Sequence, residues 1–290
     1  MEHPAKLRIG LIGSGRVGVP MAAALGRAGH RVVATTAISQ KSKERVGAML
    51  SGVLVKKPHD VSEGVDLLLL AVPDDVLPEL VSGLVSTGAI TPGQMVVHTS
   101  GRYGVDVLTP VLSASALPMA IHPVMTFTGT SVDIQRMVGA PFGVTAPEQL
   151  LPIAQALVVD LGGEPVVIPE EKRAAYHAAL AWSSNFLATV VNQGKEMVAD
   201  LGVENPSFLL APLLSATLDN ALRYGDSAMT GPISRGDAAT VQAHLDVLSR
   251  TSPAARSAYL AMARLTAERA IAAGILDVAS AERLMDVLSS

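Results

Sequence analysis

The chain has 290 residues, of which 49% are hydrophobic, 17% charged and 3% aromatic, and it contains no cysteine. Its formal net charge of −4 and its few aromatic residues argue against a nucleic-acid partner, since such proteins normally present a basic face and aromatic stacking platforms. The lack of cysteine excludes disulfides, thiolate nucleophiles and thiolate metal sites. Neither a targeting segment nor an apolar span of about 20 residues is evident, so we expect a cytoplasmic protein with no membrane partner.

Short apolar runs alternate with helical patterns in the first part of the chain, which is typical of βαβ units and a parallel sheet. Strands are expected at residues 6–12, 31–36, 66–72, 94–98, 117–121, 142–144 and 165–168. Helices are expected between them at residues 17–28, 41–50, 76–86 and 147–161. The aliphatic run at residues 67–70 indicates a central strand buried on both faces.

From residue 170 onward the pattern is helical and contains no convincing strand. Ala-rich helical stretches cover residues 171–201, 206–223, 237–249, 253–273 and 279–288, separated by Gly and Pro. The sequence therefore predicts an α/β, Rossmann-type doubly wound parallel sheet at residues 1–169, followed by an all-α domain at residues 170–290.

A glycine motif follows the first expected strand and opens an Ala-rich helix, which is the context that a dinucleotide-binding loop requires. Gly13 permits the tight turn, Gly15 lets a pyrophosphate approach the backbone, and Gly18 allows the helix to pack closely on the strand. Unpaired amides at the helix start favour anionic phosphates. The residues expected to bind cofactor here are Gly13, Ser14, Gly15, Arg16, Val17 and Gly18.

The second expected strand bears on the choice of cofactor. An NAD site usually presents an acidic residue about 20 residues after the glycine motif, but residues 35–43 contain none. Ser39 and Lys41 offer a hydroxyl and a cation that suit a 2′-phosphate, so NADP(H) is expected rather than NAD(H). The alternative is a basic helix start that is simply solvated.

Three further segments end at the same expected sheet edge, where ligands of open α/β sheets bind. Ala71, Val72 and Pro73 end the central strand and are expected to contact cofactor. Ser100, which is also expected to contact cofactor, and His122 follow the next two strands. Carbonyl reduction by hydride needs a proton donor, and a histidine suits that role because its pKa lies near the working pH. We expect His122 to be catalytic with support from Ser100; a structural histidine is the alternative.

The first long helix of the second half carries His177, Ser184 and Asn185 within about 80° of one helical face. These polar groups either satisfy one another in the core or point into a substrate crevice, where His177 and Asn185 are candidate catalytic residues and Ser184 a substrate contact. Further along, Arg235 suits a substrate carboxylate or a cofactor phosphate. Asp237 is a candidate substrate contact, although it is also a natural helix N-cap. No metal site is expected, because the histidines show no ligand spacing.

Several motifs together resemble a bacterial family that pairs an N-terminal Rossmann domain with a helical C-terminal domain of unknown function. They are His98-Thr-Ser-Gly, Ile121-His-Pro-Val-Met-Thr-Phe, Tyr176-His-Ala-Ala, Asn185 and Thr230-Gly-Pro-Ile-Ser-Arg-Gly-Asp. The layout is also similar to the 6-phosphogluconate and 3-hydroxyacid dehydrogenase superfamily, with ketopantoate reductase, pyrroline-5-carboxylate reductase and prephenate dehydrogenase. The resemblance implies a homodimer formed through the helical domain.

The resemblance to prephenate dehydrogenases implies a catalytic role for His122 with Ser100 on the preceding strand. The chain departs from hydroxyacid dehydrogenases of this type, which carry a lysine four residues before a helix asparagine: Ala181 stands there, and His177 is the nearby alternative. The expected function is an NADPH-dependent oxidoreductase acting on CH–OH or CH–NH groups. It would reduce a small carboxylate-bearing carbonyl, such as a ketopantoate-like 2-oxo acid, or an imine. The alternative is a non-catalytic NADP(H)-binding sensor or regulatory protein.

Overall fold

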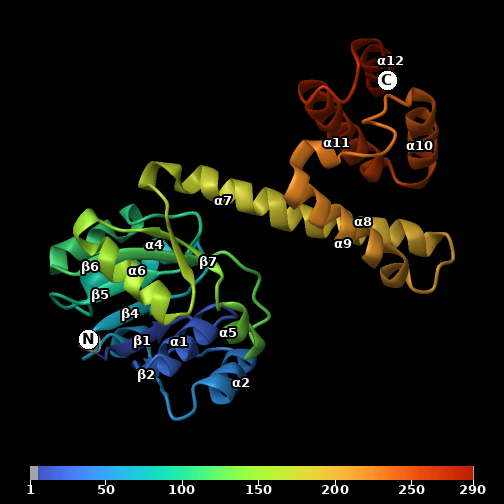
Figure 1. The fold of residues 1–290 in the computed structure, drawn as a ribbon. Coiled ribbons are helices and arrows are strands. Elements are labelled where there is room, and N and C mark those ends of the chain that lie inside the picture. The colour runs from blue at the N-terminus through green and yellow to red at the C-terminus, as the bar shows by residue number, and fades with distance from the viewer. Residues whose placement is uncertain (1–5, 290) are drawn as a thin grey trace. The chain divides into compact units, whose positions relative to one another are not determined.

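A computed structural model describes residues 6–289 of the chain. Its first part contains one eight-stranded sheet in the order β3-β2-β1-β4-β5-β6-β7-β8 (Figure 1). The strands are β1 (Arg8–Ile12), β2 (Arg31–Thr35), β3 (Leu54–Val55), β4 (Leu67–Leu70), β5 (Met95–His98), β6 (Leu117–Pro123), β7 (Pro141–Thr145) and β8 (Glu164–Val167). The central position of β4, the most aliphatic strand, agrees with its burial on both faces. The predicted Rossmann-type α/β class is confirmed.

The sheet is not parallel throughout, and this corrects the prediction. Neighbouring strands run parallel except for β6 and β7, which pair antiparallel with Pro123 opposite Phe142. The chain between them folds back instead of crossing the sheet, since the Asp133 carboxylate accepts hydrogen bonds from the amides of Thr128, Gly129 and Thr130. The segment that follows β6 therefore returns to the sheet edge at which β6 ends.

Helices cover both faces of the sheet, because successive side chains of a strand point to opposite faces. Leu67 and Leu69 share one buried core with helices α1, α2, α5 and α6, whereas Leu68 and Leu70 share another with α3, α4 and η1. The bounds are α1 (Gly18–Arg27), α2 (Gln40–Met49), α3 (Pro58–Val61), α4 (Leu77–Ser86), η1 (Asp106–Ala114, 3₁₀), α5 (Val132–Arg136), η2 (Glu148–Leu150, 3₁₀) and α6 (Leu151–Asp160).

Four of these elements were not predicted from the sequence: β3, α3, η1 and α5. β3 has only two residues, both exposed, so it leaves no apolar run to detect. Of the helices, α3 and α5 span a single turn or little more, and η1 contains Pro110 inside a 3₁₀ geometry. Short elements of this kind lack a helical hydrophobic period.

The remaining chain is helical, as predicted. It contains η3 (Glu170–Lys172, 3₁₀), α7 (Arg173–Ala181), the π-helix η4 (Trp182–Phe186), α8 (Leu187–Asp200), α9 (Pro206–Tyr224), η5 (Gly225–Ala228, 3₁₀), α10 (Ala238–Thr251), α11 (Pro253–Ala272) and α12 (Val278–Leu288). Helices α10, α11 and α12 enclose a third core that includes Val241, Leu245 and Leu284. Among residues 6–289, no helix has both the length and the apolar character needed to cross a bilayer.

The chain divides into two compact units, Met1–Asn185 and Phe186–Ser290. The predicted boundary at residue 169 lies two residues after the last strand, which ends at Val167. The first unit continues past it because α7 returns to the sheet: the buried Arg173 donates to the carbonyl oxygens of Ala120 on β6 and Gly143 on β7.

Candidate active site

The glycine loop between β1 and α1 has the geometry that the sequence motif predicts. Gly13 has φ +104°, which L side chains rarely adopt, and a Cβ there would overlap the carbonyl oxygen of Ala71. A Cβ on Gly18 would overlap the carbonyl oxygen of Gly13, so this glycine allows close packing of helix on strand. A Cβ on Gly15 would lie 3.9 Å from the nearest atom, so a ligand can approach this backbone. The amide of Gly13 donates to Thr36 Oγ1 over 2.9 Å, which fixes the turn.

A cavity of about 630 Å³ lies on one side of this loop and is lined by β-strand ends and by the start of α2. Ser39 and Ser42 contribute hydroxyls, and three cationic side chains, Arg45, Lys56 and Lys57, also line it. None of its lining residues is acidic. The cavity therefore suits a doubly charged phosphate group.

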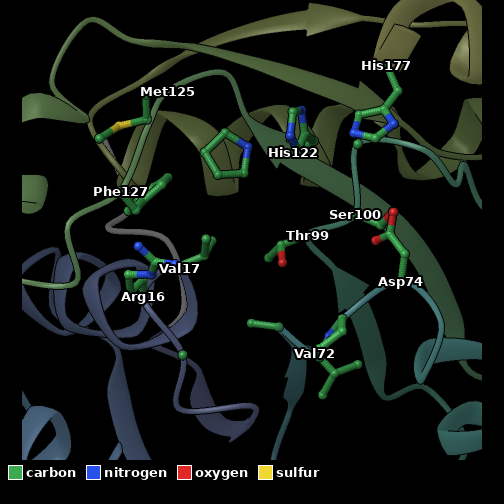
Figure 2. A pocket seen from close by; sticks show the side chains of 15 residues that line it. Arg16, Val17, Val72, Asp74, Thr99, Ser100, His122, Met125, Phe127 and His177 are labelled. Atoms are coloured by element: carbon green, nitrogen blue, oxygen red, sulfur yellow. The ribbon is translucent and has the colours of Figure 1, made fainter. Parts of the chain in front are cut away.

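A second cavity, of about 420 Å³, lies on the other side of the loop (Figure 2). In Figure 2 the rings of His122 and His177 lie next to each other along one wall, and Arg16 lies with Phe127 farther along the pocket. The full lining is Gly15, Arg16, Val17, Ala71, Val72, Pro73, Asp74, Thr99, Ser100, Gly101, His122, Pro123, Met125, Phe127 and His177. Residues from the ends of β1, β4, β5 and β6 thus meet at one sheet edge, as predicted.

A third cavity of about 300 Å³ shares His122 and His177 with the second one. Ser183, Ser184 and Asn185 contribute polar side chains to its wall, next to apolar Leu180 and Ala181. The three polar residues lie in the π-helix η4, a distortion that is often found at functional sites. The predicted grouping of His177, Ser184 and Asn185 on one face of a helix is thus present within the first unit.

His98 and Ser100 form one hydrogen-bonded turn at the end of β5. The buried His98 donates from Nε2 to the carbonyl oxygen of Gly104 over 2.7 Å, and its Nδ1 accepts from the Ser100 amide. Burial lowers the pKa of His98 to about 4, so its ring is neutral. Ser100 Oγ accepts from the amides of Arg102 and Tyr103, which leaves the hydroxyl proton available for donation. His98 thus holds Ser100 at the cavity wall.

His122 lies at the end of β6, and its Nδ1 forms a 2.8 Å hydrogen bond with the hydroxyl of Tyr176 on α7. Burial, and then the positive charge of Arg173, lower the pKa of His122 to about 4. The expectation of a histidine that titrates near neutral pH is therefore wrong for His122, because the fold removes it from water and places a cation nearby. Its imidazole is neutral at physiological pH.

The loop after β6 brings Met125 and Phe127 to the second cavity. It is organised by the buried Asp133: although burial alone would raise its pKa, the hydrogen bonds from Thr128, Gly129 and Thr130 hold the pKa of this carboxyl below its usual value. Arg45 joins this loop to the glycine loop, donating from Nε to the carbonyl oxygen of Gly129 and from Nη1 to that of Ser14. Arg45 therefore links the glycine loop to the loop that follows β6.

Four candidate residues lie outside these cavities, and the first is Gly18, whose role is the close packing described above. Lys41 is exposed on α2 and does not line the cationic cavity. Arg235 is exposed in the second unit, so its role as a carboxylate ligand stays a prediction. Asp237 caps α10 by accepting hydrogen bonds from the amide and hydroxyl of Thr240, which also lower its pKa. Asp237 therefore has the helix-capping role that its sequence context favoured.

Several residues that line the cavities or contact His122 and its strand were not predicted from the sequence. Lys56 and Lys57 follow β3, whose two exposed residues gave no strand signal. Tyr176 immediately precedes the candidate residue His177 in the Tyr176-His-Ala-Ala motif, and this adjacency could have marked it as a site residue. No such signal marks Arg173 or Arg45, whose contacts are made with residues far away in the sequence.

One surface group could hold a metal ion in principle. His59, Asp60 and Glu63 each offer one ligand atom, and these atoms lie within 4.8 Å of one another. The group lies at and after α3, which was not predicted, and its residues are exposed or half-buried. Exposed groups of this kind are common without an ion, and the expectation of no metal site stays a prediction.

Comparison with family models defines the two parts of the chain. Residues 2–123 match the Rossmann-like domain model, and residues 140–266 match a domain of unknown function, DUF2520. The fold and the cavities at its sheet edge thus define a Rossmann-like α/β protein with a helical C-terminal part. The chain thus pairs a region that matches a Rossmann-like domain with one that matches DUF2520. No curated protein sequence matches it.

Solved structures share this fold at low sequence identity. A candidate NADP oxidoreductase from Bacteroides fragilis matches with 23% identity and a TM-score of 0.77, covering 91% of this chain and 98% of that one. An imine reductase from Pseudomonas sp. matches with 21% identity and a TM-score of 0.66, covering 97% and 100%. Pyrroline carboxylate reductase from Plasmodium falciparum, solved with NADP bound, matches with 11% identity and a TM-score of 0.58, covering 92% and 97%.

Proposed function

We propose that the protein is an NADP(H)-dependent oxidoreductase that reduces a small carbonyl or imine compound. Two cavities with different linings meet at the glycine loop, and this observation is the main support for the proposal. One is lined by Arg45, Lys56 and Lys57 and by no carboxylate; the other leads to Ser100 and His122. The descriptions of the relatives from Bacteroides fragilis, Pseudomonas sp. and Plasmodium falciparum support the same chemistry.

The residues present fit a dinucleotide. The backbone at Gly15 is open, and both cavities are lined by Gly15, Ala71, Val72 and Pro73, so one extended ligand can pass from the cationic cavity to the histidine-lined one. The start of α1 adds a positive dipole end and free amides for the pyrophosphate. When bound, NADPH would supply a hydride.

The side chains around the second and third cavities provide the remaining chemistry. A reduced carbonyl needs hydrogen-bond donors at the oxygen where negative charge develops. His122 and the Ser100 hydroxyl are the proposed donors, and Asn185, Ser184 and His177 are proposed to orient the substrate along the shared wall.

The alternative is a sensor that binds NADP(H) without turnover, because a Rossmann fold does not by itself imply catalysis. The convergence of His122, His177 and Ser100 on one cavity favours the enzyme. A panel of 2-oxo acids, including ketopantoate, and cyclic imines tests the proposal by following NADPH absorbance. Tight NADPH binding with no consumption across the panel would favour the sensor.

We expect NADPH to bind at least about 10-fold more tightly than NADH, since one charge-assisted contact to a phosphate contributes about 1.5–3 kcal/mol. Lys57→Glu should remove most of this preference by weakening NADPH and leaving NADH nearly unchanged. Lys41→Glu makes the same charge change outside the cavity and is the matched control. Fluorescence titration of both cofactors measures the constants. Equal dissociation constants for the two cofactors in the wild type contradict the preference. A larger effect of Lys41→Glu than of Lys57→Glu would show that Lys41, not Lys57, determines it.

We expect the protein to form a homodimer through its helical part. Neither α8 nor α9 contains a buried residue, although both are rich in apolar side chains. Those exposed by about two fifths or more include Leu187 (43%), Val190 (55%), Phe208 (81%), Leu209 (55%), Leu213 (63%) and Leu222 (79%). An apolar area of this kind marks an interaction surface.

Light scattering coupled to size-exclusion chromatography measures the molar mass in solution, which should be that of a dimer. The double variant Leu213→Glu/Leu222→Glu should elute as a monomer. Val138→Glu places a charge on an equally exposed valine (71%) of the first unit and should remain a dimer. A monomeric wild type at micromolar concentration contradicts the expectation.

A further inference from the structure

The contact between Tyr176 and His122 has a defined geometry. Tyr176 reaches from α7 to the end of β6, and its ring meets that of His122 edge to face, with 5.7 Å between centroids and 2.8 Å between hydroxyl oxygen and Nδ1. Gly143 on β7 makes room for the phenol, because a Cβ there would lie 2.5 Å from the Tyr176 hydroxyl. The guanidinium of Arg173 lies 5.6 Å from the centre of the same ring.

This contact favours one of the two neutral tautomers of His122. Within residues 6–289, Nδ1 is the one hydrogen-bond partner of the Tyr176 hydroxyl. Burial raises the pKa of Tyr176, with Arg173 opposing, so the phenol keeps its proton and can donate it. With a proton on Nδ1, the hydroxyl would accept this bond instead, and its own proton would have no acceptor within the described residues 6–289. With the Tyr176 hydroxyl as donor to Nδ1, the proton of the neutral His122 ring lies on Nε2, which faces Gly101 at the cavity wall.

The charges around His122 favour its neutral form. Arg173 is 2% exposed, and its hydrogen bonds go to the neutral oxygens of Thr145, Ala120 and Gly143. Its Nη1 has no partner in the described part of the chain. The other groups that act on His122 are His177 and His98, which oppose its protonation, and Asp74, which favours it but is outweighed by burial and Arg173.

We propose that Tyr176 and Arg173 are positioning residues that keep His122 neutral with its proton on Nε2, so that the site accepts carbonyl oxygens and disfavours protonated imines. The inference rests on the proposed reductase function. A carbonyl oxygen accepts a hydrogen bond from Nε2–H. An iminium nitrogen has no lone pair to accept one, and its positive charge would lie near that of Arg173, whose hydrogen bonds go to neutral oxygens and whose charge is favoured by Glu170.

The proton balance follows from the same contacts. The carbonyl carbon gains a hydride from NADPH, which is oxidised, and the π pair of the C=O bond moves to oxygen. That oxygen takes the proton from Nε2 of His122, and Nδ1 takes the proton from Tyr176. Nε2 then takes a proton from water in the cavity, and Nδ1 returns its proton to the tyrosinate, which restores the starting state.

Nitrogen-15 NMR of histidine-labelled protein tests the positioning directly, without turnover. In the wild type, the His122 signals should be those of a neutral ring protonated on Nε2, with no titration between pH 5 and 8. Tyr176→Phe should shift the His122 Nδ1 signal by removing its donor, and Arg173→Met should raise the pKa of His122. His122 signals that show a proton on Nδ1, or a midpoint near the ordinary histidine value, overturn the proposal even if Arg173→Met does not fold.

A second His–Tyr pair provides the matched control. His244 Nδ1 lies 3.0 Å from the Tyr259 hydroxyl, and the two rings also meet edge to face at 5.8 Å. Tyr259→Phe should alter the His244 signals alone and leave those of His122 unchanged. It should also leave turnover unchanged, whereas Tyr176→Phe should lower kcat about 10- to 100-fold with little effect on KM.

The relative rates of carbonyl and imine reduction test the inferred preference for carbonyl substrates. The wild type should reduce 3-methyl-2-oxobutyrate at least about 10-fold more efficiently, in kcat/KM, than 2-methyl-1-pyrroline at a pH where the imine is protonated. Equal or better reduction of the imine overturns the inference and leaves the reductase function standing. Absence of any NADPH consumption contradicts the reductase function itself, and the NMR spectra still decide the state of His122.

Discussion

His122→Ala should lower turnover about 10²- to 10⁴-fold, the usual contribution of a positioned proton donor, while the dissociation constant for NADPH changes little. His122 lines the second and third cavities together with His177, whereas the cationic cavity lies on the far side of the glycine loop. Steady-state kinetics with a substrate found in the panel, and fluorescence titration with NADPH, measure the two quantities.

His59→Ala is the control for this variant, because His59 is exposed and outside all three cavities. Unchanged turnover of His122→Ala would eliminate the proposed role. The low pKa of His122, about 4, also has a consequence for pH dependence. Its charged form is populated only below that value, so no loss of activity between pH 8 and pH 5 should come from protonation of His122.

Gly13→Ala should abolish measurable NADPH binding and lower the free energy of unfolding by about 3–5 kcal/mol. Two effects add at this position. The backbone has φ +104°, which strains any L residue, and the new Cβ would overlap the carbonyl oxygen of Ala71, a backbone atom that cannot rotate away. Chemical denaturation measures the stability, and titration measures the binding.

Gly88→Ala separates the two effects. Gly88 also has positive φ, +68°, but no atom lies within 4 Å of its would-be Cβ. We expect this variant to lose only about 1 kcal/mol through backbone strain and to bind NADPH as the wild type does. Equal destabilisation in both variants would show that the packing of the glycine loop against Ala71 contributes nothing.

The helical second half and the Rossmann-type sheet were predictable because long periodic segments carry their own signal. The β4 run, aliphatic at four successive positions, indicated a strand buried on both faces, and the structure confirms it. The reversed direction of β7 was not predictable, since it depends on how Asp133 folds the preceding loop back. A carboxylate that binds three amides has the same sequence signature as one in solvent.

At the site, the residues that end strands were predictable and their partners were not. Ser100 and His122 meet because parallel strands bring their carboxyl ends to one edge. Lys57 joins the cationic cavity through a two-residue strand that has no pattern to detect. Lys41, chosen for its spacing after β2, lies outside that cavity.

The sequence by itself determined the class of fold, the glycine loop and the sheet edge at which polar side chains converge, since each depends on local spacing and strand order. Tertiary structure alone decided the chemistry available there. The charge state of His122 is governed by burial and by Arg173, 51 residues further along the chain, and its tautomer by Tyr176. A pKa depends on distances through space and on exclusion of water, and neither quantity is encoded by neighbouring residues in the chain.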